Sequence, residues 1–270
     1  MQVLKILVAA LFVLFFAEEV DAWNRAAPAE YGQVIIENYT KSTGLSPVVF
    51  EHWLHRSNFT CRICHSDIGF AMKAGVTKIT AATNMQGYYC GACHDGKRMF
   101  NDKTMFASCE KKKPKEGSTQ CDRCHSFGKK VVREYEFVTL TRKLPKTLLG
   151  NEVDWEVAET KGLIKPVDVL EGISMQRNPL KAQKDFSIQI KADWIGEVTF
   201  SHEKHARWNG CEICHPDIFP SVKKGTTKYS MFEIMDGQYC GACHDKVAFP
   251  LLDCSRCHTK QVQLGTGSSR

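Results

Sequence analysis

The sequence predicts a mostly irregular and α-helical protein with short β-hairpins, divided into two small domains that a mixed segment joins. The first observation is a tandem repeat, because residues from Phe50 onward recur 150 positions later, from Phe200. The second is a C-x-x-C-H motif, which occurs three times in each copy. The third is size, because a unit of about 75–85 residues is too short to bury an ordinary side-chain core. Something other than polypeptide therefore has to fill the interior of each domain.

The repeat fixes the expected organisation of the chain. We predict a signal peptide over 1–22, a first domain over 23–130, a connecting segment over 131–185 and a second domain over 186–270. The third motif recurs at a shift of 133 rather than 150, so the first copy carries about seventeen extra residues, within Asn101–Gln120. Two further pairs in register are Met85 with Met235 and Tyr89 with Tyr239.

The first 22 residues have the pattern of a cleaved export signal. Lys5 precedes the apolar run Ile6–Ala17, and a small residue, Ala22, marks the expected cleavage site. This run is too short for a membrane anchor, since crossing about 30 Å of hydrocarbon takes about 20 apolar residues. We therefore expect a periplasmic protein with no stable membrane insertion after cleavage, and export beyond the periplasm stays open.

Each copy is expected to begin with a β-hairpin. In the first copy Gln33–Tyr39 is rich in β-branched residues and pairs with Pro47–Phe50. In the second, the alternating stretch Phe186–Ile190 pairs with Glu197–Phe200. The stretches with the C-x-x-C-H motifs have weak periodicity and predict only short helical turns joined by loops.

The connecting segment contains neither Cys nor His between residues 131 and 184. Val131–Thr141 is rich in β-forming residues, and Asn151–Gly162 has the pattern of a short helix capped by its first residue. The segment is too apolar for a disordered linker. We expect it to lie over both domains and to fix their placement, with Trp155 as an anchor.

The spacing of the six C-x-x-C-H motifs is typical of covalent c-type haem. Two thiols three residues apart lie on one side of a helical turn, where they can bond the two vinyl groups of one porphyrin, and the His that follows can bind its iron. A disulfide framework or zinc sites are the alternatives for so many cysteines, but neither explains a His after every pair. The expected attachment residues are Cys61, Cys64, Cys90, Cys93, Cys121, Cys124, Cys211, Cys214, Cys240, Cys243, Cys254 and Cys257.

Six irons with two axial positions each need twelve ligands, and the ten histidines supply ten of them. The motifs provide His65, His94, His125, His215, His244 and His258. The remaining four stand in an F-x-H-x-x-H pattern that opens each copy, and we predict them to be the distal ligands: His52, His55, His202 and His205.

One axial position in each domain is then still unassigned. Met85 and Met235 are the only methionines at the same place in both copies, five residues before the second motif. Packing in the core is the usual role of Met, but the number of ligands favours axial binding. Met ligation raises the potential of a haem above that of His/His ligation, so each domain is expected to hold one haem of higher potential.

The F-x-H-x-x-H pattern followed by three C-x-x-C-H motifs resembles the triheme cytochrome c7 family, which is related to cytochrome c3. The resemblance covers about Val34–His125 and Phe186–His258, and it implies two c7-like triheme domains whose haems form the core. The basic members of that family have His where this chain has Met. The implied ligand pairs are His52 with His65, His55 with His94, Met85 with His125, His202 with His215, His205 with His244, and Met235 with His258.

The resemblance implies an electron carrier of an anaerobic-type respiratory chain, and not an enzyme, because no iron is left open to substrate. The implied partners are redox proteins: a quinol-oxidising membrane complex as donor, and a terminal reductase or an outer-membrane cytochrome conduit as acceptor. Two alternatives stay open. One is a multihaem reductase with an exchangeable distal ligand, and the other is a subunit of an extracellular cytochrome filament.

Two features remain outside this interpretation. The formal net charge of +6 offsets the propionates of the haems, so it does not indicate a nucleic-acid partner. Cys109 is the one Cys outside the motifs, and it is either a buried thiol or a residue that pairs between molecules.

Overall fold

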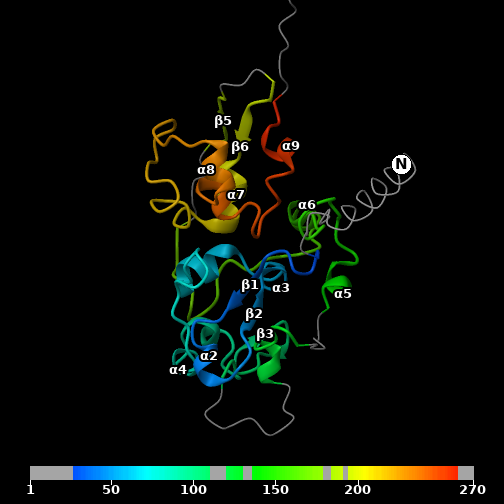
Figure 1. Ribbon diagram of the computed structural model, residues 1–270, viewed down its shortest axis with the longest axis vertical. Helices are drawn as coiled ribbons and strands as arrows, with labels where there is room; N and C mark the ends of the chain where they lie inside the picture. Colours follow the sequence, from blue (N-terminus) through cyan, green and yellow to red (C-terminus); the bar gives the residue numbers. More distant parts are fainter. Residues whose placement is uncertain (1–26, 110–119, 130–135, 179–183, 191–193, 261–270) are drawn as a thin grey trace, which may run out of the picture.

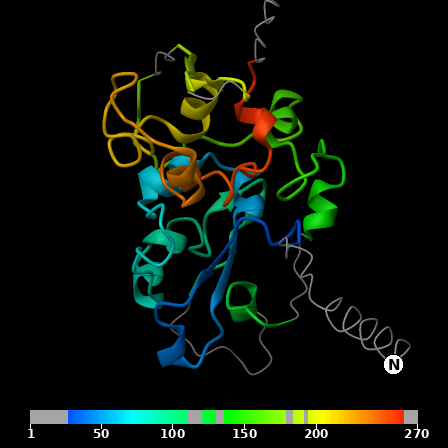
Figure 2. The same ribbon diagram turned by 45° about the horizontal axis from the view of Figure 1, so that its top comes forward.

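The structure is a computed structural model that describes residues 27–109, 120–129, 136–178, 184–190 and 194–260. The predicted signal peptide, residues 1–22, lies outside these ranges. The elements of the two repeats form two lobes, one above the other in Figure 1, and Figure 2 shows the same stacking after a rotation. None of the helices in the described ranges is long and apolar enough to cross a membrane.

Each repeat opens with the predicted antiparallel hairpin. In the first, β1 (Gln33–Ile36) pairs with β2 (Val48–Glu51), and in the second, β5 (Phe186–Ile188) pairs with β6 (Val198–Phe200). These strands consist mostly of Val, Ile and Phe, which suit a half-buried pleated surface. The hairpin prediction is confirmed in both copies. A third hairpin, β3 (Met99–Phe100) with β4 (Lys103–Thr104), was not predicted from the sequence.

A short helix follows each opening hairpin without a loop. These are α3 (His52–Arg56) and α7 (His202–Asn209), and the N-cap of α7 is Ser201, whose hydroxyl accepts from the Lys204 amide at 3.4 Å. The remaining elements of the repeats are single turns. They are α2 (Thr40–Thr43), η1 (Ile63–Ile68), α4 (Ala81–Met85), η2 (Tyr89–Ala92), η3 (Cys121–Arg123), α8 (Met231–Met235), η4 (Tyr239–Ala242) and α9 (Cys254–Cys257).

In its described residues the connecting segment forms two helices, α5 (Phe137–Thr141) and α6 (Trp155–Thr160). The β-forming composition of residues 137–141 was therefore misleading. The N-cap of α6 is Asp154, whose carboxylate accepts from the Val157 amide at 3.0 Å, so the prediction of Asn151 as cap is wrong. The side chain of Asn151 is buried and accepts a hydrogen bond from Trp155 Nε1 at 3.1 Å.

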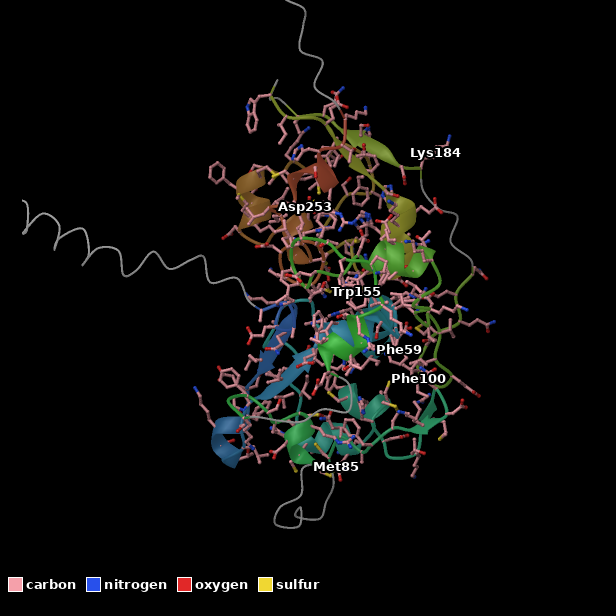
Figure 3. All side chains as sticks on the ribbon, turned by 90° about the vertical axis from the view of Figure 1, so that its right-hand side faces the viewer. Phe59, Met85, Phe100, Trp155, Lys184 and Asp253 are labelled. Carbon is pink, nitrogen blue, oxygen red and sulfur yellow. The ribbon has the colours of Figure 1, made fainter. Side chains whose placement is uncertain are left out.

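The apolar core of the described chain lies where the connecting segment meets both lobes. Its buried members are Trp53, Val153, Trp155, Ala158 and Ile164. Trp53 comes from the first repeat, and partly buried side chains of both repeats, including Trp208, pack against the cluster. Trp155 is 6% exposed and lies midway along the molecule in Figure 3. Side chains from both repeats therefore pack around Trp155 of the connecting segment, while its role in fixing the placement of the two domains stays a prediction.

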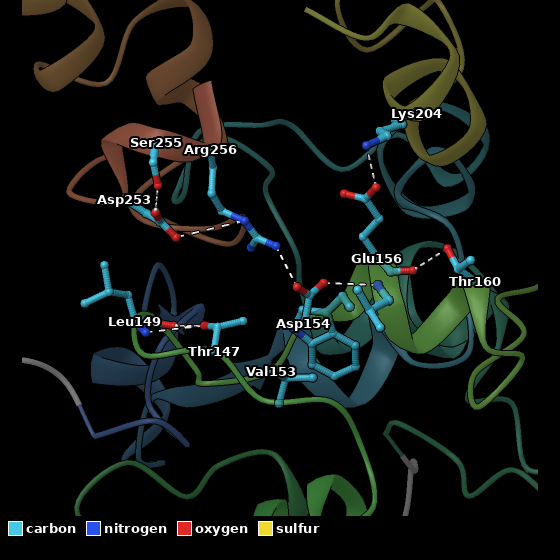
Figure 4. A network of polar contacts seen from close by, with 12 residues as sticks. Thr147, Leu149, Val153, Asp154, Glu156, Thr160, Lys204, Asp253, Ser255 and Arg256 are labelled. Atoms are coloured by element: carbon cyan, nitrogen blue, oxygen red, sulfur yellow. Dashed lines mark hydrogen bonds and ion pairs between the residues drawn. The ribbon is translucent and has the colours of Figure 1, made fainter. Parts of the chain in front are cut away.

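Ion pairs add to this apolar contact. Asp154 pairs with Arg256 at 2.7 Å and Glu156 with Lys204 at 2.5 Å, and both join α6 to the second repeat (Figure 4). Lys204 and Glu156 are both about half exposed, so that pair contributes about 1 kcal/mol at most. The buried tryptophan cluster therefore contributes more to holding the lobes together than this exposed pair does.

Candidate haem-binding sites

The predicted helical turn at the C-x-x-C-H motifs is present in the structure. In five motifs the amide of the His donates to the carbonyl of the first Cys at 2.8–3.0 Å, which closes one helical turn. The first motif runs into η1, where Gly69 N donates to Cys64 O at 3.1 Å. One turn places both thiols on one side, as attachment to a single porphyrin requires.

The second motif of each copy needs its glycine because a helix end lies against it. A Cβ on Gly91 would overlap with the carbonyl oxygen of Asn84, and a Cβ on Gly241 would overlap with that of Ile234. Asn84 and Ile234 are the residues before Met85 and Met235 at the ends of α4 and α8. The two predicted Met ligands therefore stand beside the second motif of their own repeat.

A phenylalanine orients the two histidines of each F-x-H-x-x-H pattern. The ring of Phe50 lies 4.9 Å from that of His52 and 4.4 Å from that of His55, between centroids. In the second copy Phe200 has the same separations from the rings of His202 and His205. These phenylalanines were not predicted to be part of the sites, although they recur in the sequence at a shift of 150.

Three of the four predicted His/His pairs lie at the separation that one iron between them would need. A metal–imidazole bond is about 2.0–2.1 Å long, and with about 1.1 Å from nitrogen to ring centre, two rings on opposite sides of one metal lie about 6.3 Å apart. The ring centroids are 6.5 Å apart for His52 with His65, 6.3 Å for His55 with His94, and 6.3 Å for His205 with His244. These residues fit a haem iron between each pair.

The fourth pair does not show this arrangement. In the described part of the chain the rings of His202 and His215 are not in contact with one another, and the His202 ring packs on Phe186 at 5.2 Å instead. Nor do the described residues contain a group of three or more His, Cys, Asp or Glu that could hold a metal ion directly.

The third site of each repeat is less enclosed. Met85 is 41% exposed and Met235 is 65% exposed, and Figure 3 shows Met85 far from Trp155, at one end of the molecule. The histidines predicted to share these irons are fixed in both copies: Nδ1 of His125 lies 2.7 Å from the carbonyl of Ser46, and Nδ1 of His258 lies 2.7 Å from that of Gly196. Methionine ligation stays a prediction.

Hydrogen bonds to the backbone set which nitrogen of each ring is free. In nine of the ten histidines Nδ1 lies 2.6–3.2 Å from a carbonyl oxygen, which can only accept, so Nδ1 carries the proton and Nε2 keeps its lone pair. The exception is His94, whose buried Nδ1 faces the backbone of Phe106 without a hydrogen bond of normal geometry. Histidines that bind a metal through Nε2 are typically held in this way.

Burial also keeps these rings neutral. Desolvation lowers the pKa of His52, His94 and His244 to about 4, and it lowers the pKa of His55 and His205 as well. A neutral imidazole is the form that binds a metal.

The cysteines of the described ranges keep the free thiols that thioether formation needs. In the described ranges the motif cysteines are not joined by disulfides, and burial raises the pKa of Cys64, Cys90 and Cys243 to about 12. Cys109 is partly buried, and its sulfur lies 4.0 Å from Nδ2 of Asn84, beside the second motif of the first repeat.

Comparison with known proteins agrees with this chemistry. The model of a family described as "Cytochrome c7 and related cytochrome c" matches residues 48–126 and 198–259, which is more than half of the chain. A solved "c7-type three-heme cytochrome domain" is 35% identical over 28% of this chain and 93% of that one, with a TM-score of 0.26. The C-terminal hexaheme fragment of GSU1996 is 23% identical over 84% of this chain and 96% of that one, with a TM-score of 0.25.

The dodecaheme cytochrome c GSU1996 is 23% identical over 84% of this chain and 73% of that one, with a TM-score of 0.26. No curated protein matches. Because all these TM-scores are low, the family assignment depends on the matched sequence and not on the superposition.

Proposed function

Because this chain belongs to the family of cytochrome c7 and related cytochromes c, we propose that it is an exported hexahaem electron carrier with two triheme domains and no open catalytic iron. As a multihaem c-type cytochrome of this family it functions in electron transfer. The single observation that best supports the finer assignment is the set of three His ring pairs 6.3–6.5 Å apart. Each haem, when bound, takes up or releases one electron at its iron.

The residues of the chain have two tasks in this proposal. The twelve motif cysteines would hold the porphyrins, and the ten histidines with Met85 and Met235 would supply the protein ligands of the irons. The carbonyls that accept from Nδ1 would keep the histidine rings in place. Since an iron with two protein ligands has no place for a substrate, electrons pass through and no bond of a substrate is made or broken.

Export to the periplasm and redox-protein partners complete the proposal. The apolar run Ile6–Ala17 supports export. The donor is proposed to be a quinol-oxidising membrane complex, and the acceptor a terminal reductase or an outer-membrane cytochrome conduit. An extracellular filament is the structural alternative, and sedimentation of the purified holoprotein distinguishes the two: a monomer supports the carrier.

Haem content and ligand binding test the carrier directly. The intact mass should show six covalent haems, the ferric spectrum should be fully low-spin, and carbon monoxide should not bind to the reduced protein. Fewer than six haems, or a haem that binds carbon monoxide rapidly, contradicts the proposal. The second result would favour a reductase, and the exposure of Met85 and Met235 (41% and 65%) makes the third site of each repeat the place to look.

A double substitution tests the methionines separately. Wild-type protein should show the weak long-wavelength absorption band that marks His/Met ligation. Replacing Met85 and Met235 together by His should remove this band and lower the potentials of two haems, because His/His ligation lowers the potential. Wild-type protein with six low-spin haems but without the band would overturn the Met assignment and leave the carrier intact.

A further inference from the structure

Arg56 is a buried cation between the two repeats, and the second copy of the repeat has no equivalent residue. It ends α3, directly after His55, and the same position of the second copy is Ala206. Its Nη1 donates to the carbonyl of Val247, 191 residues further along the chain, at 2.7 Å. Arg56 therefore belongs to the junction and not to the triheme unit.

The guanidinium of Arg56 is enclosed by aromatic rings. Its central carbon lies 4.9 Å from the ring centre of Trp155 and 5.0 Å from that of Trp208, which is within cation–π distance. Its Nε is buried without a hydrogen-bond partner, and among the described residues it forms no ion pair. The nearby carboxylate of Glu159 is paired with Arg207 at 3.2 Å.

Two predicted haem sites, one from each repeat, flank this cation. The thiols of Cys61 and Cys243 are close enough to Arg56 to act on it electrostatically. Val247, whose carbonyl accepts from Arg56, lies three residues after His244 and also packs on Gly32, whose carbonyl lies 2.7 Å from Nδ1 of His52: a Cβ on Gly32 would lie 3.7 Å from that of His52 and 3.8 Å from the Cα of Val247. Arg56 therefore stands between the first site of the first repeat and the second site of the second repeat.

We propose that electrons pass between the two triheme groups at this junction, and that Arg56 sets the reduction potentials of the two haems beside it. This inference rests on the proposed function. In the transfer, one ferrous iron is oxidised and one ferric iron is reduced by the same electron, with no bond formed and no proton moved.

The physical basis is the burial of the charge. Reduction adds one negative charge to a haem, and a fixed positive charge nearby stabilises the reduced form more strongly in a low dielectric than in water. Arginine stays protonated at any pH at which the protein is folded. Because Arg56 lies beside one predicted haem site of each repeat, it would raise both potentials together and leave the difference between them almost unchanged.

The test compares potentials of single haems in the full-length holoprotein. Wild type, Arg56→Gln, Arg56→Lys and Arg207→Gln are titrated with reductant, and the haem-methyl NMR signals report the oxidation state of each haem. In Arg56→Gln the reduction equilibrium of the two junction haems should shift about tenfold toward the oxidised form, which is 59 mV for one electron. The other four haems should shift clearly less.

Two controls keep the test decisive. Arg207→Gln removes the same charge from the same junction, but Arg207 is 48% exposed, so the junction haems should shift much less than in Arg56→Gln. Arg56→Lys keeps the charge, so the potentials of its junction haems should stay close to the wild-type values. If Arg56→Gln does not take up all its haems, the potentials of Arg56→Lys are used for the test instead.

The outcomes separate the inference from the function it rests on. Unchanged potentials in Arg56→Gln, an equal shift of all haems, or a full shift in Arg56→Lys would overturn the role of Arg56 while wild type remains a hexahaem carrier. A wild-type protein with fewer than six haems would instead contradict the proposed function before any variant is made.

Discussion

Replacing Gly91 by alanine should disrupt the turn that carries the second motif of the first repeat. The new Cβ would overlap with the carbonyl oxygen of Asn84 and lie 2.7 Å from its carbonyl carbon. Carbon atoms pack best at about 3.5–4.0 Å, so α4 and the turn would have to separate by about 1 Å. The obstacle is backbone and cannot rotate away, which places the cost at about 3 kcal/mol, the upper end of the usual range for overpacking.

The assay is guanidinium unfolding together with the intact mass of the holoprotein. We expect Gly91→Ala to unfold at lower denaturant or to carry five haems, and Gly241→Ala to do the same for the second repeat. Gly75→Ala is the control, because its Cβ would meet nothing within 4 Å. Its only expected cost is the strain of an alanine in the left-handed backbone conformation, about 1–2 kcal/mol. If Gly91→Ala keeps six haems and wild-type stability, the close contact with α4 is refuted.

Two further predictions concern the core and the histidines. Trp155→Ala should lower the free energy of unfolding by about 3–5 kcal/mol because it leaves a cavity in the junction core. Denaturant unfolding of this variant is compared with that of Val138→Ala, at a residue that is 71% exposed, and an equal loss of stability in both would contradict the prediction. The free energy of unfolding should also fall as the pH is lowered from about 6.5 to about 4, because unfolded imidazoles take up protons in this range while the rings of folded His52, His94 and His244, whose pKa burial lowers to about 4, stay neutral. Unfolding midpoints measured at intervals across this window test the idea, and a constant midpoint would count against it.

The repeat and the motifs allowed much of the local structure to be predicted. The β-formers before His52 and His202 predicted the hairpins, and the Cys-to-His spacing predicted the helical turns; both are local properties of the chain. The cap of α6 could not be predicted in this way. Asn151 and Asp154 are both good N-caps, and the choice depends on the burial of Trp155, which occupies the Asn151 side chain.

Contacts between residues far apart in the chain could not be predicted from the sequence either. The carbonyls that fix His52, His125 and His258 belong to Gly32, Ser46 and Gly196, and nothing in those residue types indicates the role. In the sequence, Arg56 is notable only because the two copies differ there, with Ala206 at the equivalent position of the second copy. Comparing the copies for where they disagree, as well as for where they agree, would have drawn attention to it.

The tryptophan cluster at the junction has a consequence for kinetics. Trp53 and Trp155 are almost fully enclosed, at 2% and 6% exposure, and interiors of this kind resist compression. The span that an electron must tunnel between the halves should therefore stay constant in time. Passage from one half to the other should then proceed at the same speed in dilute buffer and in thick glycerol.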